Sequence, residues 1–166
     1  MYKVVETTKG LSPLLKTFKA QMAALGMQRA HKIVFLGSAG TCVPFIELFA
    51  YTIRNDHVEM FLVPDAILEE TRSVWHVPGI GMQAGGAADP HGADFVIVLG
   101  GLSMPGSKVD AAGTAERIKA ILKPGGKVMG ICFMSMFEKA GWYGKVPFDV
   151  VIDANIDPIQ VQKFEP

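Results

Sequence analysis

The sequence is short of charged residues and carries no net charge. Of its 166 residues, 19% are Asp, Glu, Lys or Arg, below the roughly 25% of an average globular domain. Sixteen basic side chains balance sixteen acidic ones. Such a chain lacks the broad basic surface on which nucleic-acid affinity mostly depends, and the cationic face of proteins that bind anionic membranes. The composition therefore argues against a nucleic-acid partner and against a membrane partner.

Cysteine and long apolar runs are also scarce. Two cysteines, Cys42 and Cys132, cannot build a disulfide framework. No apolar run approaches the roughly 18 residues of a membrane-spanning helix, and the N-terminal residues lack a signal peptide's apolar core. Cys42, Cys132, His76 and His91 lack the spacing of zinc ligands, so we expect no metal site. These absences predict a cytoplasmic protein.

Apolar residues and glycine take the place of the missing charge. Hydrophobic residues make up 49% of the chain, and 18 residues are glycine. A neutral, apolar chain associates easily, so we expect part of its surface to lie in a homodimer interface. Residues 42–54 have a helical pattern that is apolar nearly all round, which makes this helix the candidate interface. Burial inside one subunit would explain the same pattern.

Short apolar runs alternate with helical patterns along the chain. Ser12 and Pro13 mark the start of an N-terminal helix that Gly26 ends. The expected strands are residues 32–37, 57–63, 75–79, 93–100, 127–133 and 148–152. The expected later helices are residues 42–55, a short one between 65 and 74, 109–122, and 135–140; residues 79–92 read as a glycine-rich loop.

This alternation predicts one α/β domain over residues 1–166. Strands that alternate with helices form parallel sheets through right-handed crossovers. We expect a three-layer, doubly wound, Rossmann-like fold, with a mostly parallel sheet of five to six strands preceded by the N-terminal helix.

The strand ends give the candidate binding residues. In open parallel sheets, ligands bind beyond the carboxyl ends of the strands, near the switch in strand order. Residues 37–42 connect a strand to a helix N-terminus, where backbone N–H groups and the helix dipole favour an anion. The dinucleotide fingerprint G-x-G-x-x-G matches only in part, since Ala39 and Cys42 replace two glycines. The alternative is a tight turn with Ser38 or Thr41 as the N-cap. The candidate ligand-binding residues are Gly37, Ser38, Gly40, Thr41, Asp65, Gly100, Gly101, Ser103 and Met104.

Two further features have a structural and a chemical interpretation. Residues 101–108 nearly match a phosphate-binding P-loop, but Ser107 and Lys108 are transposed, which rotates the lysine by about 100° around a helix. This argues against nucleotide hydrolysis and favours a pocket wall or a plain loop.

Cys42 lies at an expected helix N-terminus, where the pKa of a thiol is lowered. It is the candidate nucleophile, although both cysteines are most simply core residues.

Residues 93–128 resemble the middle of S-adenosylmethionine-dependent methyltransferases. The resemblance rests on an Asp94-led strand followed by a helix that ends in Leu-Lys-Pro-Gly-Gly at residues 122–126. It implies S-adenosylmethionine as cofactor, residues 34–40 as its glycine loop, Asp65 as the ribose-binding acid and an added reversed strand. The same five residues are also a common signal for the C-terminal end of a helix.

Over its whole length the chain resembles an uncharacterised archaeal family found mainly in methanogens. The residues that carry this resemblance are Val-Phe-Leu-Gly-Ser-Ala-Gly-Thr-Cys at 34–42 and Phe-Val-Ile-Val-Leu-Gly-Gly-Leu-Ser-Met-Pro at 95–105. The family consists of single Rossmann-like domains of unknown function, so it implies the fold and supplies no catalytic residue. Our leading hypothesis is a domain that binds a nucleotide-like or other small anionic ligand. A methyltransferase and a non-catalytic structural or partner-binding subunit are the alternatives, and the sequence does not decide whether the protein is an enzyme.

Overall fold

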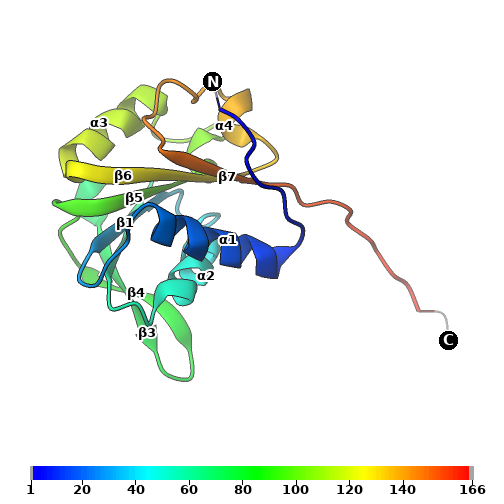
Figure 1. The fold of residues 1–166 in the computed structure, drawn as a ribbon, viewed down its shortest axis with the longest axis horizontal. Helices are drawn as coiled ribbons and strands as arrows, with labels where there is room; N and C mark the ends of the chain where they lie inside the picture. Colours follow the sequence, from blue (N-terminus) through cyan, green and yellow to red (C-terminus); the bar gives the residue numbers. More distant parts are fainter. Residues whose placement is uncertain (1, 165–166) are drawn as a thin grey trace.

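The computed structural model describes residues 2–164 and shows a sheet covered by helices on both faces (Figure 1). Apolar runs form its inner strands, because a strand buried on both faces needs apolar side chains at every position. The strands are β1 (Lys32–Gly37), β2 (Glu59–Pro64), β3 (Arg72–Val77), β4 (Gly81–Ala87), β5 (Ala93–Leu99), β6 (Leu122–Phe133) and β7 (Val150–Ala154). The helices are α1 (Leu11–Ala24), α2 (Val43–Ile53), α3 (Ala111–Ile121) and α4 (Met136–Lys139), with short 3₁₀ turns η1 (Leu68–Glu70) and η2 (Gly100–Ser103).

The strand order is β4-β3-β2-β1-β5-β6-β7. Strands β1, β2, β5, β6 and β7 are parallel, whereas β3 runs antiparallel to β2 and β4 antiparallel to β3. The chain moves from β1 to β2 in one direction and from β5 to β6 in the other, so the order switches between β1 and β5. The α/β class and the mostly parallel sheet are confirmed, whereas the expected count of five to six strands is wrong, because the sheet formed by residues 2–164 has seven.

The extra strand lies where the sequence predicted a loop. Residues 81–87 pair with β3 as strand β4, although five glycines between 79 and 92 are typical of a loop. Backbone hydrogen bonds hold an edge strand, and they need no particular side chain. The short helix expected between 65 and 74 is also wrong: it is one 3₁₀ turn, followed directly by β3. β-Branched and aromatic residues in β3 favour the extended chain there.

Helix α2 is buried within its own chain. Its Ile46, Phe49, Ala50 and Ile53 are fully covered by α1 and one face of the sheet. The ring of Phe49 lies 5.0 Å from that of Phe18 in α1. This burial accounts for the apolar pattern without a second subunit. Dimerisation through residues 42–54 remains a prediction.

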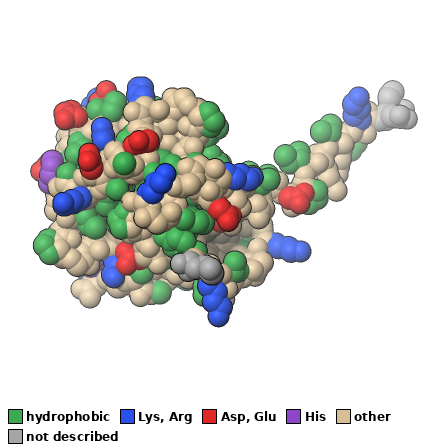
Figure 2. Space-filling model, turned by 90° about the horizontal axis from the view of Figure 1, so that it is seen from above, with side chains coloured by type: hydrophobic (Ala, Val, Ile, Leu, Met, Phe, Trp, Pro, Cys, Tyr) green, Lys and Arg blue, Asp and Glu red, His purple; other side chains and the backbone are tan. Residues whose placement is uncertain are grey.

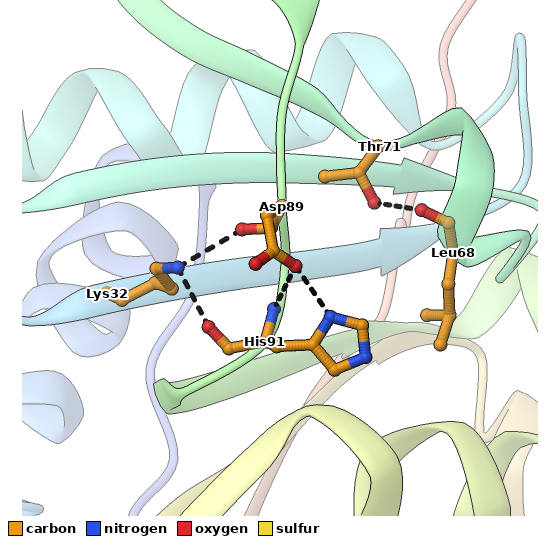
Figure 3. Close-up of polar contacts among 5 residues, drawn as sticks. All are labelled: Lys32, Leu68, Thr71, Asp89 and His91. Carbon is orange, nitrogen blue, oxygen red and sulfur yellow. Dashed lines mark hydrogen bonds and ion pairs between the residues drawn. The ribbon is translucent and has the colours of Figure 1, made fainter.

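The connection from β4 to β5 is a short strap, residues 88–92, that Lys32 holds (Figure 3). Lys32 Nζ donates to the carbonyl oxygens of Asp89 and His91, at 3.1 and 2.8 Å. The carboxylate of Asp89 accepts the amide of His91 at 3.0 Å and contacts its Nδ1 at 2.6 Å. Because Lys32 begins β1, these contacts fix the strap beside the strand against which β5 pairs.

Asp94 makes the amino edge of the sheet sensitive to acid. Its carboxylate accepts the Lys32 amide at 2.8 Å and pairs with Lys123 and His31. Burial raises the pKa of Asp94, but Lys123, the Lys32 amide and His31 together hold it below its usual value. A carboxyl whose pKa is lower in the folded state stabilises the fold above its unfolded-state pKa of about 3.9, and this stabilisation is lost as pH falls.

We therefore expect Asp94→Asn to lower the free energy of unfolding by about 1–3 kcal/mol at neutral pH. The loss should shrink as pH falls towards about 3, because the wild-type carboxylate is then neutralised too. Urea unfolding at a series of pH values measures this. Glu116→Gln, on an exposed position of α3, is the control, and a deficit that stays constant across the pH range would contradict the prediction.

Candidate functional site

The loops that follow β1 and β5 touch at the carboxyl edge of the sheet, where the strand order switches. A Cβ atom added to Gly101 would overlap both Cys42 Sγ and Ser38 Oγ, and one added to Gly37 would lie 2.6 Å from Cys42 Cβ. Only glycine at 101 allows the two loops to come this close. The structure thus brings the predicted residues of the first loop into contact with the second.

The first loop is held by its own hydroxyl groups. Ser38 Oγ lies 2.6 Å from Thr41 Oγ1 and 3.2 Å from Cys42 Sγ. Cys42 is the residue before α2, and no side chain caps that helix, so the expectation of a Ser38 or Thr41 cap is wrong. Gly40 has a φ of 82°, which favours glycine.

Asp65 and Lys108 join the end of β2 to the loop after β5. Asp65 Oδ1 accepts the Ala39 amide at 2.9 Å, and Oδ2 pairs with Lys108 Nζ at 2.9 Å. The Ala39 amide and Lys108 lower the pKa of Asp65, and Asp65 raises the pKa of Lys108. Sequence reasoning set Lys108 aside because it misses the P-loop position. Its place after a glycine-rich loop was the signal that could have marked it.

A hollow of about 580 Å³ lies on the α3 side of the second loop. Its lining includes Ser103, Met104, Ser107, Lys108, Arg117 and Trp142. Arg117 is positioned by hydrogen bonds from Nε to the carbonyl oxygen of Ala66 (2.8 Å) and from Nη1 to that of Gly113 (3.0 Å). Ser103 and Met104 are the predicted site residues that line the hollow. Gly37, Ser38, Gly40, Thr41, Asp65, Gly100 and Gly101 lie outside its lining, and the sequence did not mark Arg117 as a candidate.

A second polar cluster stands at the ends of β6 and β7. Asp153 accepts hydrogen bonds from the Ser135 amide at 3.0 Å and from Ser135 Oγ at 2.9 Å, and Cys132 Sγ lies 3.5 Å from it. Met134 and Ser135 both have positive φ. Burial raises the pKa of Cys132 to about 12, so this thiol stays protonated at neutral pH.

Both cysteines are free and buried, as expected for core residues. Cys42 is 5% exposed, and its role as a nucleophile remains a prediction. Within residues 2–164, no three His, Cys, Asp or Glu side chains are grouped so that they could hold a metal ion. No helix in this part of the chain is long and apolar enough to cross a membrane.

The resemblance to methyltransferases is local. Asp65 does follow β2 beside the first loop, where the resemblance implies a ribose-binding acid, but its oxygens are engaged by Ala39 and Lys108. The resemblance also implies an added reversed strand. Within residues 2–164 the one reversed strand is β3, which lies between β2 and β4 on the side of the sheet away from β7, and β7 is parallel to β6.

Comparison with known proteins agrees with the resemblance over the whole chain. A protein of Methanothermobacter thermautotrophicus described as uncharacterized is 37% identical over 148 residues, which are 86% of this chain and 94% of the relative. The uncharacterized protein MJ1183 of Methanocaldococcus jannaschii is 36% identical over 154 residues, 93% of this chain and 91% of the relative. A crystal structure of a protein of unknown function from M. thermautotrophicus superposes with a TM-score of 0.87 at 31% identity, covering 98% of this chain and 99% of that one. Residues 9–157 match the model of the family described as "Uncharacterized protein conserved in archaea (DUF2124)", and the chain belongs to this family.

Proposed function

We propose that this protein binds a nucleotide-like or other small anionic molecule in the hollow beside the switch point of its sheet. The observation that carries the proposal is the lining: Lys108 and Arg117 supply positive charge, and Ser103 and Ser107 supply hydroxyl groups. Asp110 is also in the lining, and its Oδ1 accepts the Gly113 amide at the start of α3. A volume of about 580 Å³ is within the range of small-molecule sites.

The lining also favours a ligand with an apolar part. Met104 and Trp142 face the same hollow as the two cations. Methionine adapts to flat apolar groups, and Met104 is 46% exposed, whereas Trp142 is 3% exposed and offers a ligand little of its ring. A molecule that joins a phosphate or carboxylate to a ring system, as nucleotides do, matches both halves of the lining.

An anion that binds Lys108 would share the lysine with Asp65. Lys108 is exposed and already shares its charge with Asp65 at 2.9 Å. An incoming phosphate would extend this pair, with the lysine between two anions. Arg117 uses Nε and Nη1 for backbone carbonyl oxygens, which leaves donors of Nη2 for the ligand.

We expect thermal unfolding with AMP, ATP, NAD, S-adenosylhomocysteine and inorganic phosphate to identify the ligand class. A ligand at 100 times its Kd stabilises a fold by about 2.7 kcal/mol, which raises Tm by roughly 5–10 °C in a domain of this size. Lys108→Met should weaken binding about 10-fold or more, because a hydrogen bond to a charged group contributes about 1.5–3 kcal/mol. Lys119→Met, on the exposed side of α3, is the matched control.

The same panel separates the alternatives. A response to S-adenosylhomocysteine alone would favour the methyltransferase interpretation, whereas no response to any compound would overturn the proposed binding function and favour a structural or partner-binding subunit. The two free, buried cysteines fit the reducing cytoplasm in which we place the protein.

A further inference from the structure

The segment after β7 leaves the body of the protein as an extended tail (Figure 1). Its Ile159, Val161 and Phe164 are 81%, 85% and 91% exposed. In Figure 2, apolar side chains are spaced along this protruding tail. Ile159 and Val161 alternate with Gln160 and Gln162, a period of two that is typical of a strand with one covered face. The tail has the pattern of a strand, and no strand of the described chain pairs with it.

The opposite edge of the sheet has the complementary feature. Strand β4 has a neighbour on one side only within residues 2–164, so its outer N–H and C=O groups face outward. None of its seven residues is charged or proline. Natural edge strands are usually protected by lysine, proline or a covering segment, because an open edge accepts further strands. β4 has none of these side chains, and its pairing with β3 is regular over residues 81–84, before the register shift between Ala84 and Ala87.

An exposed tryptophan lies beside this edge. Val74 and Met82 point into the core under α2, so the alternate residue Trp75 lies on the other face of the β3–β4 pair. Trp75 is 60% exposed, and its ring lies next to Gly85 of β4. Ile80, in the turn between the two strands, is exposed as well. An added strand along β4 would find apolar contact area on this face.

The tail cannot reach this edge within its own chain. Strands β7 and β4 are six strand spacings apart, which is about 29 Å. Residues 155–158, which precede the alternating segment, span at most about 14 Å when fully extended. A β4 edge that receives residues 159–163 therefore belongs to another molecule. Since the edge is uncharged and the chain has no net charge, a second copy meets no electrostatic repulsion.

We propose that residues 159–163 of one copy of this chain add as a strand to the free edge of β4 in a second copy, with Ile159 and Val161 against Trp75. Backbone hydrogen bonds hold the added strand, and the alternating side chains set its register. Reciprocal exchange between two copies supplies each β4 edge with a neighbour. This surface is distinct from helix α2, in which Tyr51 is the one large apolar residue that is exposed.

Light scattering on the full chain tests the association. The expected mass is at least twice the 17.9 kDa of one chain, and Ile159→Glu with Val161→Glu should reduce it to that of a single chain. Gln160→Glu with Gln162→Glu adds the same charge to the other side of the tail and should have a smaller effect. All four positions are exposed, so neither pair should disturb the fold of one subunit.

Cross-linking tests the placement. We expect a Val161→Cys chain mixed with a Gln83→Cys chain to form a disulfide between the two, since Gln83 of β4 pairs with Trp75 and lies on the same face. The native cysteines are buried and should not compete. A single-chain mass at every protein concentration would overturn the proposal. So would an association that survives both glutamates, or the absence of the mixed disulfide.

Discussion

Replacing Gly100 by valine is expected to lower the free energy of unfolding by about 3 kcal/mol. An added Cβ at this position would lie 2.6 Å from Cys132 Cβ and 3.0 Å from Cys132 Cα. Cys132 lies in the buried strand β6, so neither its backbone nor its Cβ can move away without shifting the sheet. Urea unfolding, monitored by tryptophan fluorescence, measures the loss.

Gly86→Val is the matched control, because an added Cβ there meets nothing within 4 Å. Substitutions at such surface positions usually change stability by less than about 0.5 kcal/mol. Equal losses for the two variants would show that the close approach of β5 and β6 at Gly100 is not what requires glycine. Because Gly100 begins the loop that leads to the hollow, Gly100→Val should also weaken the binding of any ligand that the thermal-unfolding measurements identify.

Strands β1, β2 and β5 could be predicted from the sequence to within two residues, whereas β6 begins five residues and β3 three residues before the predicted start. Strands β1 and β5 are continuous apolar runs followed by glycine, and every residue of β5 is buried. A strand that is buried on both faces has few positions for polar side chains, so a run of apolar residues in the sequence is enough to identify it. The helix α2 was predicted for a similar reason, since a helix packed between α1 and the sheet tolerates few polar residues.

The strand β4 and the strand order could not be predicted in the same way. Five of the seven residues of β4 are exposed or glycine at the sheet edge, so burial imposes no apolar pattern on them. The order of strands depends on which distant segments pack together, and a local sequence pattern does not encode it. Ligand-binding loops follow the carboxyl ends of parallel strands, and this rule predicted that residues 37–42 and 100–104 lie at the same edge of the sheet. The structure places the two loops in contact there.

The hollow itself was missed because its charged residues belong to no motif. Arg117 lies in the middle of α3, where its spacing is that of an ordinary surface residue, and its position is set by the carbonyl oxygen of Ala66 far away in sequence. Lys108 departs from the P-loop spacing, yet the path of its loop carries it to Asp65. The P-loop motif describes a lysine at one fixed position in the loop. A loop with a different backbone path can place a lysine from another position beside a ligand.

Phe49→Ala is expected to lower the free energy of unfolding by about 4 kcal/mol, because it removes a fully buried ring and leaves a cavity. The ring of Phe49 packs against Phe18 across the α1–α2 interface, so the loss falls on contacts within one chain. Chemical unfolding at several protein concentrations measures it. Tyr51→Ala, on the exposed side of the same helix, is the control and should cost less than about 1 kcal/mol.

The concentration dependence distinguishes burial inside one subunit from burial between two. If α2 is covered only by its own chain, the difference between Phe49→Ala and the wild type is the same at every protein concentration. If residues 42–54 form the dimer interface, both Phe49→Ala and Tyr51→Ala weaken association. The part of each deficit that comes from association then shrinks as the protein is diluted, because wild type and variant both unfold from monomers at low concentration. The double variant with Ile159→Glu and Val161→Glu removes the tail contact first. A deficit from Tyr51→Ala that still depends on concentration in that background would place an interface on α2.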